Sequence, residues 1–504
     1  MTRWRSLAFL TAVAVVFVVA TAVAAEQDTL EKLVKKLNLN LSKGEISVSG
    51  ISSGGFMAHQ FHVAHSADLK GAGIIAGGPY YCAQGSLDTA IAECTTIGEQ
   101  SRWGPDWPYR SYRGPCPAPV GQQARCNENK AVAMAEQAIS DTLKFSKKNK
   151  IDDPIGLADD KVILILGKSD RLVPQGVMDA MGLYYEMIYK KYNKDPENFL
   201  SYPKRLPAEH SVPIDNFIGL KVATGNEVDE KKNEQVGNCT TFGSPYLNVC
   251  TKQDCKEICC TKSDCSAYNN LVSTCGYECD PQCSMQCAAS VDAVADAALA
   301  ILKHIYDDGK SPWNIRNDKV KIKDWDWDLG KPVVDSNCQR YDNKVDKRCQ
   351  WLRKTIFVFD QPQKLPGGHF TYLADKGFIF IPEKCTKDAK SCKRLHIAFH
   401  GCEQGYDFPS EIKAIYSKLW TPFVENAGFN EWADANDIVV LYPQAQPVSI
   451  PFQTNPKGCW DFWGYGGINN DYHTKEGRQI SAVWQMVERL VPDLLKKSVM
   501  PSDF

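Results

Sequence analysis

Apolar and polar positions follow two different periods along most of this chain. In residues 45–238 and 355–500, short apolar runs are separated by stretches whose apolar residues recur at helical spacing. The expected strands are residues 45–49, 70–75, 161–166, 378–381, 395–399 and 438–442. The expected helices are residues 131–145, 290–306 and 475–497. Because strands that alternate with helices are typical of parallel sheets, this pattern predicts an α/β fold.

Two stretches interrupt the pattern. Residues 239–287 hold ten of the chain's 20 cysteines, and residues 310–350 are polar and rich in tryptophan. Cys279, Cys283 and Cys287 are spaced so that they could bind zinc, but disulfides are the better prediction for an exported chain. The parts that we expect are a signal peptide at 1–24, a first α/β part at 25–238, a cysteine-rich disulfide insertion at 239–287 and a second α/β part at 288–504.

The first residues have the composition of a secretion signal. Arg3 and Arg5 precede an uncharged apolar run over residues 7–23, which ends in a small-x-small cleavage sequence at 22–24. A membrane anchor is the alternative, but the run is short for a span and no charged stop follows it. We expect the mature protein to be secreted, extracellular, monomeric and without membrane contact.

Composition adds three constraints. The net charge is only −2, with no basic stripe, so nucleic acid is not an expected partner. The even number of cysteines agrees with pairing in an oxidising compartment. Asn40 and Asn238 begin N-x-S/T sequences, which predict a glycoprotein on a eukaryotic secretory route.

The candidate nucleophile lies between an expected strand and an expected helix. Residues 50–54 read GISSG, which matches the G-x-S-x-G turn that lifts a serine out of a sheet. Ser52 is the nucleophile in this frame. Ser53 is the rival, but its frame places the bulky Ile51 where the turn needs a small residue.

The acid and the base are expected later in the chain, at the ends of strands. Asp170 follows the apolar strand 161–166, whereas Asp159 and Asp160 precede that strand and lie at its wrong end. His210 lies in a proline-flanked loop after Asp170 and is the expected base.

Other histidines are weaker candidates. His473 is a rival base that the sequence does not exclude, whereas His304 and His396 are expected to be structural. His59, His62 and His65 are spaced three apart on the helix after Ser52, but no acidic or cysteine partner is evident, so a metal site is not expected.

Residues 324–335 resemble a calcium loop only in part. Leu329 stands at the position that requires glycine, and Asp335 stands at the twelfth position. No metal and no cofactor are therefore expected.

The oxyanion donors indicate an unusual chain order. The Ser53 N–H is the expected first donor, and the second normally comes from a loop that precedes the nucleophile. Here the matching sequence, His400-Gly401-Cys402, follows a strand far downstream. The order nucleophile, acid, base, oxyanion loop predicts a circularly permuted α/β-hydrolase.

Several segments together resemble the fungal-type, single-domain polyhydroxybutyrate depolymerases. They are GISSGGFMAHQF, AGGPYYCA, GKSD, PAEHSVP, AFHGCEQ, NEWADAND, VVLYPQ and NPKGCWDFWGY. The resemblance implies a circularly permuted α/β-hydrolase in which Ser52, Asp170 and His210 are catalytic. It also implies that the N–H groups of Ser53 and Cys402 form the oxyanion hole and that Trp460 binds substrate. The insertion and residues 310–350 depart from the family and leave the substrate open.

The expected function is extracellular hydrolysis of a polyhydroxybutyrate-type polyester by two-step acyl transfer. The alternatives are a carboxylesterase on small or plant-derived esters, of feruloyl or acetyl type, and a catalytically idle secreted binding protein. We further expect disulfides between Cys402 and Cys459, which flank the site, and between the neighbouring Cys385 and Cys392.

Overall fold

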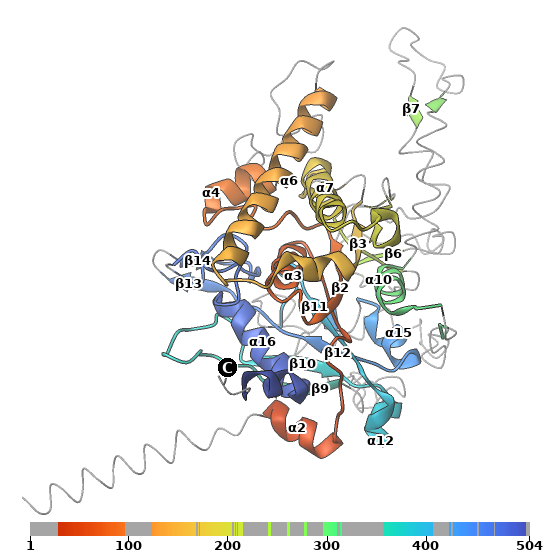
Figure 1. Cartoon of the computed structure of the whole chain (residues 1–504), viewed down its shortest axis with the longest axis vertical. Helices are drawn as coiled ribbons and strands as arrows, with labels where there is room; N and C mark the ends of the chain where they lie inside the picture. Colours follow the sequence, from red (N-terminus) through yellow and green to blue (C-terminus); the bar gives the residue numbers. More distant parts are fainter. Residues whose placement is uncertain are drawn as a thin grey trace, which may run out of the picture.

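The structure of this chain, a computed structural model, has helices packed around a central sheet (Figure 1). The described residues are 29–95, 123–167, 170, 172–203, 206, 208, 210–214, 240–242, 260–262, 277–279, 296–309, 313–314, 356–406, 423–424, 427–450, 453–467 and 469–499. The predicted signal peptide, the Asn238 sequon and nearly all of residues 239–287 and 310–350 lie outside them.

An eight-stranded sheet forms the centre, in the order β4-β3-β2-β1-β11-β12-β10-β9. The strands are β1 (Ile46–Ile51), β2 (Leu69–Ile75), β3 (Lys161–Ile165), β4 (Leu200–Ser201), β9 (Ile356–Asp360), β10 (Lys376–Phe380), β11 (Arg394–Phe399) and β12 (Ile438–Tyr442). All neighbours pair in parallel except β10, which is antiparallel to both β9 and β12. This architecture confirms the predicted α/β-hydrolase fold class.

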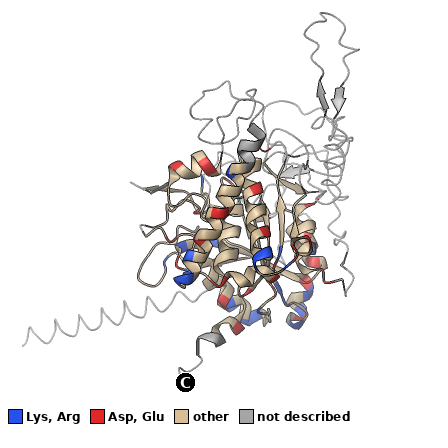
Figure 2. Ribbon diagram, turned by 45° about the horizontal axis from the view of Figure 1, so that its top comes forward, with Lys and Arg blue, Asp and Glu red and all other residues tan. Residues whose placement is uncertain are grey.

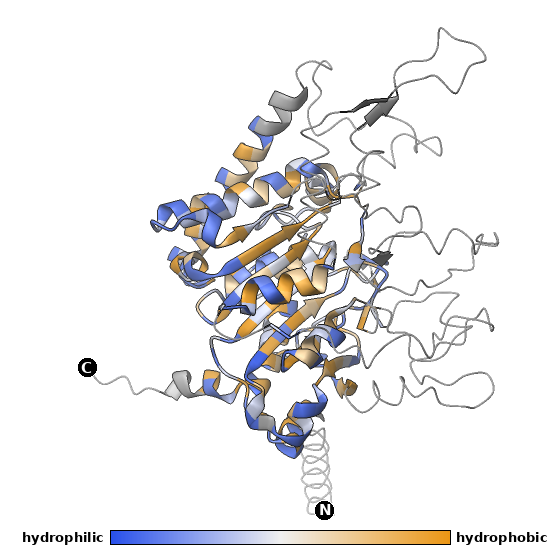
Figure 3. Cartoon of the chain, turned by 90° about the vertical axis from the view of Figure 1, so that its right-hand side faces the viewer, coloured by the Kyte–Doolittle hydropathy of each residue, from blue (hydrophilic) through white to orange (hydrophobic). Residues whose placement is uncertain are grey.

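The central strands are apolar and buried, as strands covered on both faces should be (Figure 3). His396 of β11 contacts Phe429 of α15 (Phe429–Ala435), whereas Phe399 of the same strand contacts Phe61 of α3 (Ser53–Ala64). Because residues an odd number apart on a strand face opposite sides, α15 and α3 cover opposite faces. Helix α10 (Ala297–Tyr306) packs beside α15.

On the face of α3 lie three further helices. They are α6 (Gln123–Lys147), α7 (Gln175–Lys191) and α16 (Arg478–Leu490). Tyr185 of α7 and Trp484 of α16 contact the histidines of α3, and α6 packs along α7. Acidic and basic residues are interspersed over the ribbon (Figure 2), as the near-neutral net charge leads one to expect.

The ends of two expected helices need correction. The helix expected over 475–497 stops at Leu490, because Pro492 cannot continue the hydrogen-bond ladder; a 3₁₀ segment, Pro492–Val499, follows. The helix expected over 290–306 begins only at Ala297, where the Asp296 carboxylate accepts from the Leu299 N–H as an N-cap.

The first described helix, α2 (Thr29–Leu37), packs against α16 near the end of the chain (Figure 1). The chain therefore enters and leaves the fold in one region. Within the part of the chain that the structure describes, no helix is both long and apolar enough to cross a membrane.

Candidate active site

Ser52 occupies the sharp turn between β1 and α3. Its backbone has φ 58° and ψ −125°, a strained conformation for any residue with a side chain. The flanking glycines are required by close backbone contacts. A Cβ on Gly50 would lie 2.1 Å from the Gly54 oxygen, and one on Gly54 would lie 2.3 Å from the His400 oxygen. This is the geometry that G-x-S-x-G predicts.

Ser53, the rival nucleophile, faces inward. Its side chain is buried, and its Oγ accepts a hydrogen bond of 3.2 Å from the Trp460 N–H. Ser52 is partly exposed by contrast. The Ser53 N–H lies in the first turn of α3, where helical N–H groups have no intrahelical acceptor.

Asp170 and His210, 40 residues apart, are brought together after β3. The His210 Nδ1 donates to the Asp170 Oδ2 over 2.8 Å. The Asp170 Oδ1 accepts from the N–H groups of Leu172 and Val173, at 2.8 and 2.9 Å, which fixes the carboxylate. The Asp170 side chain is 1% exposed and that of His210 is 15% exposed, so the carboxylate is buried while the imidazole remains accessible from the surface. This arrangement can hold a general base in one orientation.

His473, the rival base, lies in an aromatic pocket instead. Its ring is 4.0 Å from the ring of Tyr81 and 4.3 Å from that of Phe145, measured between centroids. Burial lowers the pKa of His473 to about 3. No described group forms a hydrogen bond with either ring nitrogen, so this histidine lacks the orienting carboxylate that a base needs.

Three other histidines considered above form hydrogen bonds that hold the fold together. His396 bonds through both ring nitrogens, at 2.7 Å each, to the hydroxyls of Ser47 and Ser49, and the His304 Nε2 donates to the Phe199 oxygen. His59 bonds to the Gly78 oxygen.

The expectation that the α3 histidines lack an acidic partner was wrong for His62. Its Nε2 lies 2.9 Å from the Asp160 Oδ2 and its Nδ1 lies 2.8 Å from the Tyr185 hydroxyl. His65 stacks on Trp484. Among the described residues there is no cluster of three or more His, Cys, Asp or Glu that could hold a metal.

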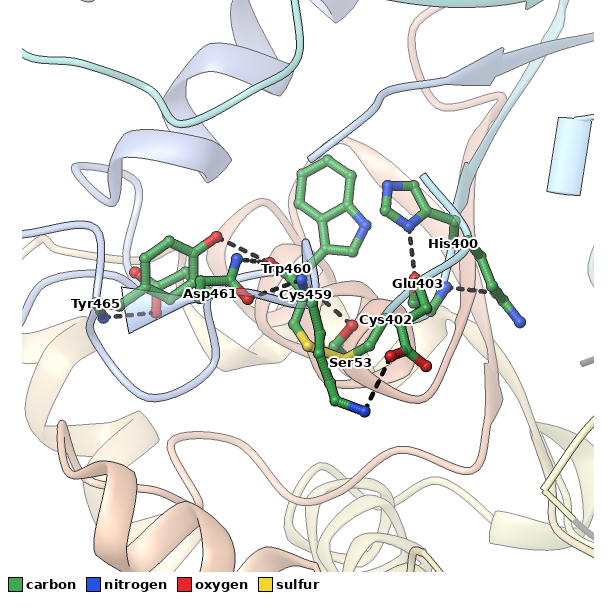
Figure 4. The surroundings of a disulfide bond; sticks show 12 residues. Ser53, His400, Cys402, Glu403, Cys459, Trp460, Asp461 and Tyr465 are labelled. Carbon is green, nitrogen blue, oxygen red and sulfur yellow. Dashed lines mark hydrogen bonds and ion pairs between the residues drawn. A yellow bond between two sulfur atoms is a disulfide. The ribbon is translucent and has the colours of Figure 1, made fainter. Parts of the chain in front are cut away.

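The loop after β11 lies against Ser52. A Cβ on Gly401 would come within 3.3 Å of the Ser52 Cβ. Cys402 forms a disulfide with Cys459, which Figure 4 shows beside Ser53 and Trp460. This confirms one predicted disulfide, and the pair Cys385–Cys392 confirms the other. A third, Cys82–Cys94, was not predicted.

The segment after Cys459 contains two features that the sequence did not reveal. The Trp460 side chain is fully buried against Phe399 and His400, so its expected contact with substrate stays a prediction. The Asp461 carboxylate accepts from four backbone N–H groups, at 2.7 to 3.3 Å, from residues 463, 464, 465 and 466. Burial raises its pKa to about 6, partly offset by these bonds.

Comparisons with known proteins give a consistent result. No protein-family model matches the chain. Over 453 residues it is 27% identical to a poly(3-hydroxybutyrate) depolymerase of Delftia acidovorans, with 90% of this chain and 60% of the relative covered. The chain thus spans about 60% of the length of that relative. It is 25% identical to a polyhydroxybutyrate depolymerase of Talaromyces funiculosus, with 90% and 91% covered.

A solved structure agrees in fold. The crystal structure of PHB depolymerase from Penicillium funiculosum matches with a TM-score of 0.50 at 24% identity, covering 90% of this chain and 98% of that chain. Both sequence relatives extend over nine tenths of this chain, through both halves of the sheet. The chain is similar to polyhydroxybutyrate depolymerases over nine tenths of its length.

Proposed function

We propose that this chain is a secreted serine esterase that hydrolyses a polyhydroxybutyrate-type polyester. The observation that carries the proposal is the position of the His210–Asp170 pair. Asp170 follows β3, Ser52 follows β1, and the 400–402 loop follows β11. Because these strands run parallel, all three lie at the same edge of the sheet. The similarity to polyhydroxybutyrate depolymerases supports the substrate class.

The chemistry would proceed in two steps. The Ser52 Oγ attacks the ester carbonyl carbon while the His210 Nε2 takes the hydroxyl proton, and Asp170 keeps the imidazole oriented. The carbonyl oxygen becomes an oxyanion that the N–H groups of Ser53 and Cys402 stabilise. His210 then protonates the departing alkoxide, which leaves an acyl-enzyme. Water, deprotonated by His210, releases the hydroxy acid or oligomer and restores the Ser52 hydroxyl.

The same proposal includes a circular permutation. Strand β1 lies at the centre of the sheet, between β2 and β11, and the later strands β9 to β12 fill the other half. Joining α16 to β1 and cutting elsewhere would give the order in which the oxyanion loop precedes the nucleophile. The contact between α2 and α16 supports this, since permutation requires chain ends that lie close together.

A paired assay tests the function. Purified protein and its Ser52→Ala variant are each given an opaque suspension of poly(3-hydroxybutyrate) and, separately, a soluble 4-nitrophenyl ester of butyrate. We expect the wild type to clear the suspension and cleave the soluble ester, and the variant to do neither. Cleavage of the soluble ester without clearing would favour a small-ester carboxylesterase, and inactivity on both would favour an idle binding protein.

A further inference from the structure

The proposed oxyanion donor Cys402 belongs to a peptide unit that a neighbouring side chain holds. The His400 Nδ1 donates to the Gly401 carbonyl oxygen over 2.7 Å. That carbonyl and the Cys402 N–H form one planar trans peptide, in which C=O and N–H point in opposite directions. The bond that fixes the Gly401 oxygen therefore also fixes the direction of the Cys402 N–H.

His400 can make this bond in only one neutral form. Its Nε2 accepts from the Ala445 N–H over 3.0 Å, so the ring proton must be on Nδ1. The ring is fully buried and joins the 400–406 loop to the segment after β12. A Cβ on Gly405 would lie 2.9 Å from the His400 Cε1, so the loop closes tightly around the ring.

The Gln404 side chain fixes the peptide between His400 and Gly401. Its Oε1 accepts from the Gly401 N–H over 2.7 Å. On the other side, the Glu403 N–H donates to the Lys457 oxygen over 2.7 Å. The N–H groups before and after that of Cys402 are thus both bonded within the protein, whereas no described group accepts from the Cys402 N–H. The Cys402 N–H is therefore available to a ligand, and Gly401 just before it lies beside Ser52.

We propose that Gln404 and His400 are positioning residues that aim the Cys402 N–H at the oxygen of the substrate carbonyl. This inference rests on the proposed esterase function and extends it to residues that do not touch the substrate. Removing an oxyanion donor costs about 10²–10³ in kcat, and misaligning one costs less. Loss of the Gln404 bond should therefore lower kcat by roughly 10- to 100-fold.

The test uses Gln404→Met, which keeps the size of the side chain but removes the acceptor. Kinetics on the soluble butyrate ester should show the fall in kcat with KM changed less than about twofold, because the oxyanion exists only in the transition state. Gln137→Met, an exposed change on α6, is the matched control and should be silent. Gln404→Asn, whose amide is too short to reach, should reproduce the Met result.

A second measurement distinguishes misalignment of the oxyanion donor from a general loss of structure. An alkylboronic acid that adds to Ser52 places a negatively charged oxygen in the oxyanion hole, so its affinity should fall by the same factor as kcat/KM. Unchanged kcat in both variants, or lost activity with unchanged boronic acid affinity, would overturn the proposal. Failure of the esterase function itself would show separately, as a wild type no more active than Ser52→Ala.

Discussion

Strand β3 has a histidine–carboxylate pair at each end, and the two pairs have almost the same hydrogen-bond distance, through Nδ1 of His210 and Nε2 of His62. Asp170 follows the strand and lies 2.8 Å from His210, while Asp160 precedes it and lies 2.9 Å from His62. Their surroundings differ. The other hydrogen-bond partner of His62 is the Tyr185 hydroxyl. Burial lowers the pKa of His62 to about 3 and raises that of Asp160 well above its usual value.

The difference shows that pair geometry does not make a catalytic site. Burial favours the neutral form of both members of the His62–Asp160 pair, and their side chains are only 0% and 7% exposed. His210 is partly exposed at the edge of the sheet where the strained Ser52 and the 400–402 loop also lie. Position at the carboxyl ends of the strands, not the hydrogen bond, distinguishes the candidate base.

The largest effect that this comparison predicts is at the nucleophile. Ser52→Ala should lower kcat on a soluble ester by about 10⁴–10⁶ without unfolding the protein. Ser53→Ala should retain measurable hydrolysis, since it loses only the bond from the Trp460 N–H. Activity in Ser52→Ala together with a dead Ser53→Ala would reverse the assignment.

The same substitution at the two histidines should have opposite consequences. His210→Ala should lower kcat by about 10⁴ or more with little change in stability, and combining it with Ser52→Ala should add no further loss. His62→Ala should leave Asp160 and Tyr185 unsatisfied and cost about 1–3 kcal/mol of unfolding free energy, or more with the cavity, while kcat of the folded fraction stays near wild type. Steady-state kinetics and urea unfolding of both variants measure these two effects. An active His210→Ala variant would exclude His210 as the base.

The buried histidines should make the fold sensitive to acid. Burial lowers the pKa in six of them to about 3 or 4, or well below the usual value: His59, His62, His65, His396, His400 and His473. The unfolded chain binds these protons near pH 6.5, so stability is complete above that pH and each site loses about 1.4 kcal/mol per pH unit below it. The carboxyl groups whose pKa values are raised oppose this trend, but they are fewer: Asp160, Asp461, Asp471 and Glu488.

We therefore expect the midpoint of thermal unfolding to fall steeply between pH 6.5 and 4. A midpoint that is flat or rising over this range would show that these rings are protonated in the folded protein. The His62→Ala variant should lose one site and show a shallower fall than the wild type.

Breaking the disulfide beside the site should have a smaller effect. Paired Cys402→Ser and Cys459→Ser changes should cost about 2–4 kcal/mol of stability and also lower kcat, because the disulfide links the oxyanion loop to the segment that bonds Ser53. The matched changes at Cys385 and Cys392, which close a much shorter loop, should lower stability less and leave kcat unchanged. Equal kcat values in the two double variants would show that the Cys402–Cys459 disulfide does not affect hydrolysis.

The smallest effect on chemistry is expected from the insertion at residues 239–287. With ten cysteines and several aromatic residues in 49 positions, it cannot bury all of its apolar side chains, and we predict that some of them bind polymer. Replacing it with a short linker should preserve turnover of the soluble ester and reduce adsorption to polyester film. Unchanged adsorption in a folded deletion would make the insertion purely structural.

The sequence sufficed where local pattern determines structure. The GISSG turn, the strand before Asp170 and the apolar runs of β11 and β12 each depend on neighbours along the chain, and the structure places them as expected. Spacing of this kind reports a turn or a strand because only nearby residues determine it.

Contacts between distant residues could not be predicted in the same way. Asp160 reaches His62 across 98 residues, and Trp460 meets Ser53 across 407. The burial of Trp460 depends on how β11 and its loop pack around it. The Asp461 site had a weak local signal, an aspartate followed within five residues by two glycines, but such turns occur in many proteins.

The central position of β1 also determines when the sheet can assemble during synthesis. Ser47 of this strand is bonded to His396, 349 residues later in the chain. At a synthesis rate of about 5–20 residues per second, β1 would wait roughly 20–70 s for that neighbour. Ser52 would therefore leave the ribosome long before β11 and the 400–402 loop exist to pack beside it.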